Sequence, residues 1–506
     1  MRFLRFQTLA AATVVLAVTP VPGVSLAATA FDPFSVETRT SPAPNLPWIP
    51  VGPLPQVPAP EQMQRLPAEL SRPVSLAELT EIALRLNVRT RQAWMQARVE
   101  AAQFGVDHSG VFPQVSGLIG YRTARPISGT SGLPNNTLID SSGRPATAAA
   151  GGQPYTHLSQ IGPTLNLSYI LFDFGKRAED KAATEYRILA ANLAQNRALQ
   201  EVAFQVEQAY YRVLGLEQLV GASKGSLKNF ETALDASRRR RESGLATAAD
   251  FYRAETQVGQ AQLVLSRNEG ELSKARGLLA GTVGLPVDFP LQLQGMTARP
   301  PVSAITQSME ELLTNAKVSR PDLVAAEARA RAARATARAE SKASLPSVEL
   351  SGQFARQFYT DPATLVPQNA YSAGINLRIP IFSGFSETYR MRRREEEAKI
   401  AEAARDQLYT QTQQDVWQAY FDLQTAAAGI ASSANLIKSA GQSADAAVAR
   451  YGAGVGSLLD LITAQLDDTN AKVQEIQSHL DWYLALARLN FALGASDSTV
   501  RGSRKP

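Results

Sequence analysis

The 506-residue chain contains no cysteine and only three histidines. The absence of cysteine excludes disulfide bonds, thiolate metal sites and a lipid attached to an N-terminal cysteine. The histidines, His108, His157 and His479, lie in different segments, and their spacing matches no metal-binding motif. No nucleophile–base pattern is recognisable either. We therefore expect no enzymatic activity, no bound metal and no cofactor.

Long apolar runs and a strong net charge are also lacking. The apolar run Leu9–Val18 is too short to cross a bilayer, and no other run approaches the length of about 18 residues that a spanning helix needs. Arg2 and Arg5 precede this run, and prolines and small residues follow it, so residues 1–27 are predicted to be a cleavable secretory signal. Removal of both arginines lowers the formal net charge from +5 to +3. A balance this weak does not favour binding to nucleic acid, and we expect an exported protein.

What the chain does have is one long pattern that occurs twice, 210 residues apart. The segment "VEQAYYRVLGL" at 206–216 is matched by "VWQAYFDLQTA" at 416–426. The segment "RESGLATAADFYRAET" at 241–256 is matched by "YGAGVGSLLDLITAQL" at 451–466. The register between the two copies holds without an insertion. Such repetition indicates one structural unit built twice.

The composition divides the chain around these repeats. Prolines are concentrated between residues 42 and 60, which indicates an extended leader that either packs on a surface or stays mobile. The predicted boundaries are 1–27 for the signal, 31–73 for the proline-rich leader, 74–284 for the first repeat, 285–305 for a linker, 306–495 for the second repeat and 496–506 for a disordered tail.

Each repeat is predicted to open with a helix and to continue into two strands. The first helix is expected to begin at Leu76 with Ser75 as N-cap and Glu78 in a capping box, and to continue unbroken to Val106. The four predicted strands alternate apolar and polar residues, which is typical of strands with one apolar face: Phe112–Arg122, Thr164–Leu171, Leu345–Arg356 and Ser372–Ile381. Their composition predicts loops at Thr123–His157 and Tyr359–Asn369, which lie between the paired strands.

Very long helical patterns follow the second strand of each repeat. They are predicted at Lys176–Glu242 and Glu387–Gly452, are interrupted by a glycine, and resume at Ala248–Val283 and Leu458–Leu493. A helix of about 65 residues is on the order of 100 Å long. Helices of this length, rich in alanine, indicate a bundle or tube.

Four strands of about ten residues are each long enough to cross a bilayer when tilted. Four strands cannot close a barrel, and open sheet edges are not tolerated in lipid. The smallest membrane barrels have about eight strands, so at least two chains must contribute.

The order helix, strand, loop, strand, long helix, glycine turn and helix, given twice, resembles the TolC-type outer-membrane efflux family. The motifs that carry the resemblance are "LFDFGK" and "IFSGFS", "QAYYRVL" and "QAYFDLQ", and "SGLATAADFYRAE" and "AGVGSLLDLITAQ". It covers roughly residues 75–495. The fold that it implies is mainly helical with transmembrane strands. Three identical chains, with two pseudo-symmetric repeats each, would form a 12-stranded β-barrel in outer-membrane lipid and a long α-helical barrel across the periplasm.

The resemblance also implies a function. The homotrimer would be the exit duct of a tripartite efflux pump that passes small molecules to the exterior, and its partners would be a periplasmic adaptor (membrane fusion) protein and an inner-membrane transporter. Two alternatives stay open: the outer-membrane duct of a type I protein secretion system, and a periplasmic coiled-coil structural protein. The alternating strands favour a duct, because a coiled-coil scaffold has no use for lipid-facing strands.

The same resemblance places the two glycine turns at the periplasmic tip, where the adaptor docks. A plain turn with a helix cap is the simpler interpretation, and Thr247 and Ser457 are suited to cap the returning helices. The residues implied in docking are Gly244, Leu245, Thr247, Gly454, Val455 and Ser457.

Three residues near these turns are candidates for the pore constriction. Asp250 and Asp460 each fall in a first helical turn, where a carboxylate complements the helix dipole. Three copies of Asp460 around an axis would instead form an anionic ring that selects cations. Tyr451 matches a family tyrosine that latches the closed tip, but the arginine expected with it is replaced by Gly456.

A run of four arginines, Arg238–Arg241, precedes the first turn. Cations are favoured at a helix C-terminus, so the run is either a solvated helix end or a cluster of salt bridges to the gate or the adaptor. The sequence leaves both interpretations open.

Overall fold

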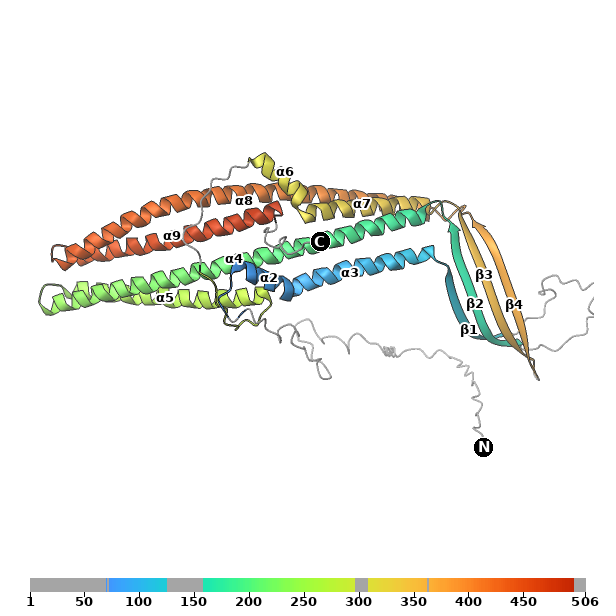
Figure 1. Ribbon diagram of the computed structural model, residues 1–506, viewed down its shortest axis with the longest axis horizontal. Coiled ribbons are helices and arrows are strands. Elements are labelled where there is room, and N and C mark those ends of the chain that lie inside the picture. The colour runs from blue at the N-terminus through green and yellow to red at the C-terminus, as the bar shows by residue number, and fades with distance from the viewer. Residues whose placement is uncertain (1–69, 71, 125–157, 296–307, 362–363, 496–506) are drawn as a thin grey trace, which may run out of the picture. The chain divides into compact units, whose positions relative to one another are not determined.

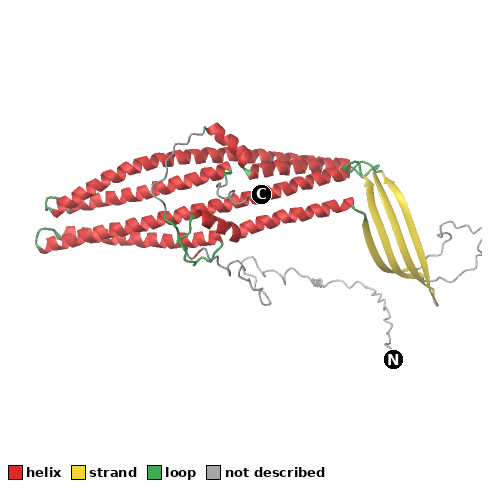
Figure 2. Cartoon of the chain, in the orientation of Figure 1, coloured by secondary structure: helices red, strands yellow, loops and turns green. Residues whose placement is uncertain are grey.

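The computed structural model describes residues 70, 72–124, 158–295, 308–361 and 364–495. Met1–Pro60 and Glu61–Pro506 are separate units, and the described residues all belong to the second. The predicted signal, most of the leader, the tail and most of the first predicted loop lie outside the described residues. Long helices run beside one another, and the strands continue from one end of them (Figure 1, Figure 2). In chain order the elements are α2 (Leu76–Leu86), α3 (Val88–His108), η3 (Ser109–Val111), β1 (Gln114–Ala124), β2 (Leu158–Phe172), α4 (Lys176–Glu242), α5 (Ala248–Val283), α6 (Met309–Ser319), α7 (Pro321–Lys342), β3 (Ser347–Asp361), β4 (Thr364–Arg378), α8 (Ser386–Gly452) and α9 (Leu458–Leu493).

The internal repeat is visible in the helix bounds. Helices α4 and α8 have 67 residues each, and α5 and α9 have 36 each. The bounds predicted for α4, α5 and α9 are confirmed, and α8 begins one residue earlier than predicted. Positive φ angles at Gly244 and Gly454 reverse the chain between the paired helices. Glycine adopts this conformation without steric cost, which explains why each helical pattern is interrupted at a glycine.

The turn from strand to long helix needs two consecutive left-handed residues in both repeats. These are Phe174 and Gly175 in the first repeat, and Gly384 and Phe385 in the second. The order of glycine and phenylalanine is reversed between the repeats, while the backbone conformation is the same at both positions. The fold therefore conserves the backbone path here rather than the residue at each position.

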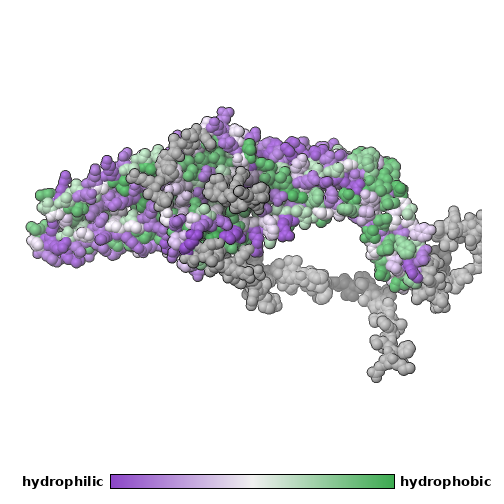
Figure 3. Space-filling view, viewed as in Figure 1, coloured by the Kyte–Doolittle hydropathy of each residue, from purple (hydrophilic) through white to green (hydrophobic). Residues whose placement is uncertain are grey.

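The four strands form one antiparallel sheet in the order β1-β2-β3-β4. The register of the strands places residues of similar polarity opposite one another, in rows that cross the sheet. One row is polar throughout and consists of Ser116, Asn166, Gln353 and Ser372. The next row, on the other face, consists of Gly117, Leu165, Phe354 and Tyr371. The predicted alternation is confirmed, and hydrophobic surface gathers over the strands and their junction with the helices (Figure 3).

The strands β2, β3 and β4 are each 15 residues long, which is longer than predicted. The prediction of a loop at Tyr359–Asn369 is wrong, because Tyr359 pairs with Val366 and the hairpin extends to Asp361 and Thr364. Pro367 lies within β4 opposite Phe358, so the strand continues through this proline. At its other end β4 stops at Arg378, two residues before Pro380, rather than at Ile381.

The prediction of one unbroken first helix is also wrong. Asn87 takes an extended backbone, with ψ of 131°, and separates α2 from α3. Arg320, with ψ of 114°, separates α6 from α7 in the same way. The C-terminal end of α5 packs closely against the first break, and the end of α9 packs against the second. At the first break only a glycine fits, because a Cβ on Gly284 would lie 2.9 Å from the carbonyl oxygen of Leu86. A Cβ on Gly494 would likewise lie 2.9 Å from the Cα of Arg320.

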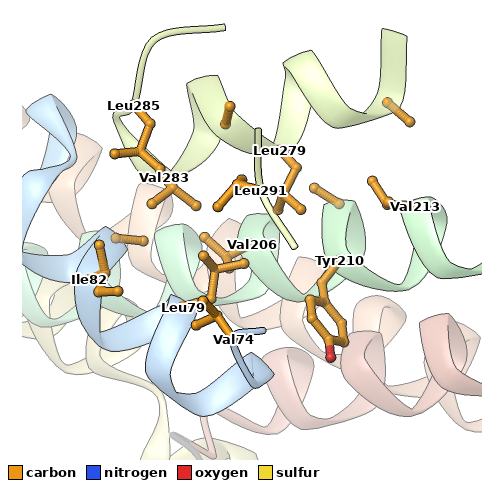
Figure 4. Close-up of a cluster of buried hydrophobic side chains, with 14 of the residues drawn as sticks. Val74, Leu79, Ile82, Val206, Tyr210, Val213, Leu279, Val283, Leu285 and Leu291 are labelled. Carbon is orange, nitrogen blue, oxygen red and sulfur yellow. The ribbon is translucent and has the colours of Figure 1, made fainter. Parts of the chain in front are cut away.

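Two buried clusters hold these breaks in place. The first junction core packs α2 against α4 and α5, with Val206 and Leu279 among its members (Figure 4). The second junction core packs α6 against α8 and α9, with Val416 and Leu489 at the equivalent positions. All four of these side chains are at most 5 % exposed. The two repeats therefore resemble each other in their apolar packing as well as in their backbone.

Helix α7 lies between α4 and α8 and buries mostly alanine, including Ala325, Ala335 and Ala339. Side chains this small let helix backbones approach closely, as the alanine-rich sequence predicts. Ion pairs link the neighbours, such as Arg405 Nη1 to Glu327 Oε2 at 2.9 Å. None of the described helices has a stretch long and apolar enough to cross a membrane.

Candidate functional site

The two turns that join the long helices share a backbone hydrogen bond. Leu245 N–H donates to the Arg240 carbonyl at 2.8 Å, and Val455 N–H donates to the Arg450 carbonyl at 3.1 Å. The side chains of these turn residues point into solvent, and Leu245 is 78 % and Val455 80 % exposed. Each turn thus presents one large, exposed apolar side chain.

The predicted N-caps are both present, but the two aspartates beside them differ. Thr247 and Asp250 form a reciprocal capping box, in which the Asp250 carboxylate accepts from Thr247 N at 3.2 Å and from Thr247 Oγ1 at 2.8 Å. Ser457 accepts from Asp460 N at 3.1 Å, without the reciprocal bond. Within the described residues, no hydrogen bond or ion pair involves the Asp460 carboxylate. The first aspartate is a cap, and the second is an exposed, unpaired charge.

Tyr451 is buried where the two helical hairpins meet. It is 6 % exposed and packs in a tip core that includes Phe230 of α4 and Leu458 and Leu461 of α9. This contact lies between the first hairpin (α4 and α5) and the second (α8 and α9). The structure therefore places Tyr451 between the hairpins, while Asp250 and Asp460 each stand in the first turn of their own returning helix.

Tyr451 of the second hairpin contacts an arginine of the first hairpin. Arg240 Nη2 donates to the carbonyl oxygen of Tyr451, and its guanidinium carbon lies 4.1 Å from the centroid of the Tyr451 ring. At Gly456, where the family arginine was expected, a Cβ would lie 3.0 Å from Tyr451 N. A cation over an aromatic face is attracted by its quadrupole. Sequence reasoning missed this pair, because the two residues belong to different hairpins, which come together where α4 packs against α9.

Two further members of the arginine run, Arg238 and Arg241, contact residues of the first hairpin. The guanidinium carbon of Arg241 lies 4.2 Å from the ring centroid of Phe251, and Arg238 approaches Asp235 at 3.9 Å. Among the described residues, none of the four arginines forms an ion pair with Asp250 or Asp460. The run is thus not a purely solvated helix end. A cluster of salt bridges to the adaptor stays a prediction.

A sheet with one apolar and one polar face, continued by long paired helices with exposed turns, is the architecture of the solved outer-membrane channels that the chain resembles. The profile of the outer membrane efflux protein family matches residues 79–285 and 312–495, which is more than half of the chain. The chain belongs to this family. It is the exit duct of an efflux system, and it is located in the outer membrane.

Individual relatives agree with this assignment. The chain is 26 % identical to protein CyaE of Bordetella pertussis over 414 residues, which cover 81 % of this chain and 82 % of that protein. It is 25 % identical to the outer membrane efflux protein BepC of Brucella suis over 346 residues, or 68 % of this chain and 74 % of that one. These relatives and the four-stranded sheet support a duct over a coiled-coil structural protein.

Solved structures share the fold. The outer-membrane channel OprN superposes with a TM-score of 0.71 at 19 % identity and covers 88 % of this chain and 99 % of its own. The CmeC outer membrane channel of Campylobacter jejuni also has a TM-score of 0.71, at 17 % identity, and covers 89 % of this chain and 96 % of its own.

Proposed function

We propose that three copies of the chain form the duct, and that β4 of one copy pairs with β1 of the next. The observation that carries this proposal is the four-stranded sheet, in which one face is apolar and β1 and β4 are edges. In an antiparallel sheet of four strands β1 and β4 run in opposite directions, so joining the edges continues the antiparallel order. Lipid does not tolerate unpaired edges, and three copies would supply twelve strands.

Native mass spectrometry of the detergent-extracted protein tests this assembly. We expect a trimer as the dominant species. A stable monomer would contradict the proposal, and a stable dimer would support closure by eight strands instead.

The two exposed turns are proposed to dock the periplasmic adaptor, which in turn connects the duct to an inner-membrane transporter. Exposed Leu245 and Val455 supply the apolar contacts that a partner surface can bury. Leu245→Glu and Val455→Glu should each weaken adaptor binding at least about tenfold, since burial of a carboxylate is costly. Ser243→Glu, beside the first turn, is the control for added charge. Equal weakening by all three variants would indicate that only charge matters.

The gate is proposed to lie at the second turn. Asp460 supplies a carboxylate with no partner among the described residues, and three copies around an axis would select cations. Tyr451, held by Arg240, would keep the second hairpin packed against the first in the closed state. Planar-bilayer recordings test both parts, because selectivity reports on Asp460 and open probability reports on the Arg240–Tyr451 pair.

A further inference from the structure

A cavity of about 560 Å³ lies between the two hairpins, on the side of Tyr451 that faces away from the turns. Its walls come from α4 of the first hairpin and from α8 and α9 of the second. We name it the inter-hairpin cavity. Its volume is within the range of small-molecule sites, which is about 300–1,000 Å³. Any occupant would contact both hairpins at once.

Hydrogen-bond acceptors line this cavity. Gln465 is 7 % exposed, and its Oε1 atom is buried without a hydrogen-bond partner. Asp468 is 6 % exposed, and its Oδ2 atom accepts from Lys472 Nζ at 2.7 Å. Its Oδ1 atom lies beside Gly441, where a Cβ would be 3.7 Å away. An unsatisfied buried acceptor favours a ligand that donates hydrogen bonds.

The charge of the lining favours a cation. The charged residues of the lining are two carboxylates, Asp445 and Asp468, and one ammonium group, that of Lys472. Asp445 is exposed and connects the lining to solvent, whereas Asp468 is buried. Asp468 already accepts a hydrogen bond from the ammonium group of Lys472, so it can accept one from the ammonium group of a ligand in the same way. Lys472 is itself 45 % exposed at its side chain, so its head group is free to move into water when another donor arrives.

The remaining wall suits a short hydrocarbon chain. Ala233, Ile437 and Ala444 line the cavity between the polar groups. A metal ion would need several oxygen ligands in a close shell, whereas an organic amine uses both the acceptors and the apolar wall. We propose that the inter-hairpin cavity binds a small organic cation, an alkyl diamine or guanidinium compound, with N–H donors directed to Gln465, Asp468 and Asp445.

The bound cation would stabilise the packing of the second hairpin on the first, because it contacts α4 as well as α8 and α9. A ligand that prefers one state of two shifts the equilibrium towards that state. Tyr451 forms part of the same cavity wall. This consequence rests on the proposed gate, while the binding itself does not.

Isothermal titration calorimetry of the solubilised full-length protein with putrescine tests the site. We expect saturable binding of putrescine and none of 1,4-butanediol, which has the same length and no charge. Asp468→Asn should weaken the affinity at least about tenfold, because it removes a charge-assisted hydrogen bond. Asp467→Asn is the matched control, since it removes the same charge from the adjacent, exposed position of α9. Equal loss in both variants, or equal binding of the diol, would overturn the proposal.

A second variant keeps the test decisive if Asp468→Asn misfolds. Ala444→Leu adds side-chain volume to the cavity wall and keeps every charge, and it should abolish the putrescine heat without loss of the assembled protein. Retained binding in that variant would place putrescine elsewhere and refute the site. Planar-bilayer recordings with and without putrescine then test the link to the gate. Unchanged open probability together with confirmed binding would contradict the link between the cavity and the gate and leave the binding site standing.

Discussion

The two repeats have the same backbone and similar apolar cores, but their polar contacts differ. At the first break Asn87 Nδ2 donates to the carbonyl of Thr282 at 2.7 Å. At the second break Arg320 Nη1 donates to the carbonyl of Ala492 at 3.3 Å, which is the equivalent position 210 residues later. Both contacts satisfy a carbonyl near the C-terminus of a returning helix, where four carbonyl groups lack partners. One repeat uses a neutral amide and the other a buried charge.

The buried charge brings further charges with it. Arg320 is 2 % exposed, and it is paired with Asp322 at 2.6 Å and with Asp415 at 3.3 Å. Arg197 of α4 approaches Asp322 at 3.5 Å and stacks on Phe491 of α9 with its guanidinium carbon 3.7 Å from the ring centroid. The second junction is thereby tied to α4 of the first repeat. The two copies thus share a backbone path at their junctions, while the second junction is held by an ionic clamp.

The largest expected effect is at this clamp. Arg320→Ala leaves two carboxylates without their main partner and a helix-terminal carbonyl without a donor. We expect a loss of about 3–5 kcal/mol in the free energy of unfolding, as for other buried pairs that lose one member. Asn87→Ala removes a cap and one hydrogen bond and should cost about 1–2 kcal/mol. Urea denaturation of the solubilised variants measures both. Similar losses would mean that the two junctions are energetically equivalent despite their different chemistry.

The clamp also makes the second junction sensitive to acid. Burial raises the pKa of Asp322, but the hydrogen bond from Arg320 and the charges of Arg197 and Arg320 outweigh it, so the pKa is lowered overall. A carboxyl whose pKa is lower in the folded state stabilises the fold above its unfolded pKa of about 3.9. This stabilisation is lost as the pH falls through the folded pKa.

Thermal melts of the wild type and Asp322→Asn between pH 3 and pH 6 test this sign. The melting temperature of the wild type should exceed that of Asp322→Asn by a constant amount near pH 6, and this difference should shrink below a pH of about 4. Asn87→Ala is the control, and its difference from the wild type should not follow the same curve. If the difference in melting temperature between the wild type and Asp322→Asn grew as the pH fell, the pKa of Asp322 would be raised in the folded state instead.

The sequence predicted the long helices well and the breaks poorly, for a physical reason. Gly244 and Gly454 interrupt the helical pattern locally, so a short window of sequence identifies them. Asn87 and Arg320 are set by the ends of α5 and α9, which lie far along the chain. Local signals were nevertheless present, because asparagine is a preferred N-cap and Pro321 is suited to a first helical position. The Arg240–Tyr451 contact had no local signal, since it joins residues of two different hairpins.

A smaller effect is expected where the hairpins touch. Arg240→Ala removes the donor to the Tyr451 carbonyl and the cation over its ring, a contact worth about 1–2 kcal/mol. The open probability in planar bilayers should therefore rise by roughly tenfold, if the pair holds the closed state. Arg241→Ala, which removes the equivalent contact with Phe251 inside the first hairpin, should leave it unchanged. A matching rise in both variants would attribute the effect to lost positive charge.

The smallest effect on stability separates the two aspartates at the turns. Asp250→Ala breaks the capping box with Thr247 and should cost about 1 kcal/mol, without a change in ion selectivity. Asp460→Ala removes a carboxylate that has no partner among the described residues, so stability should change by less than about 0.5 kcal/mol. If three Asp460 side chains form the anionic constriction, this variant should weaken cation selectivity and block by metal ions in planar bilayers while trimer formation stays intact. The matched Asp460→Glu variant should retain the selectivity. Unchanged selectivity in Asp460→Ala channels would reduce this aspartate to a charge that complements the helix dipole.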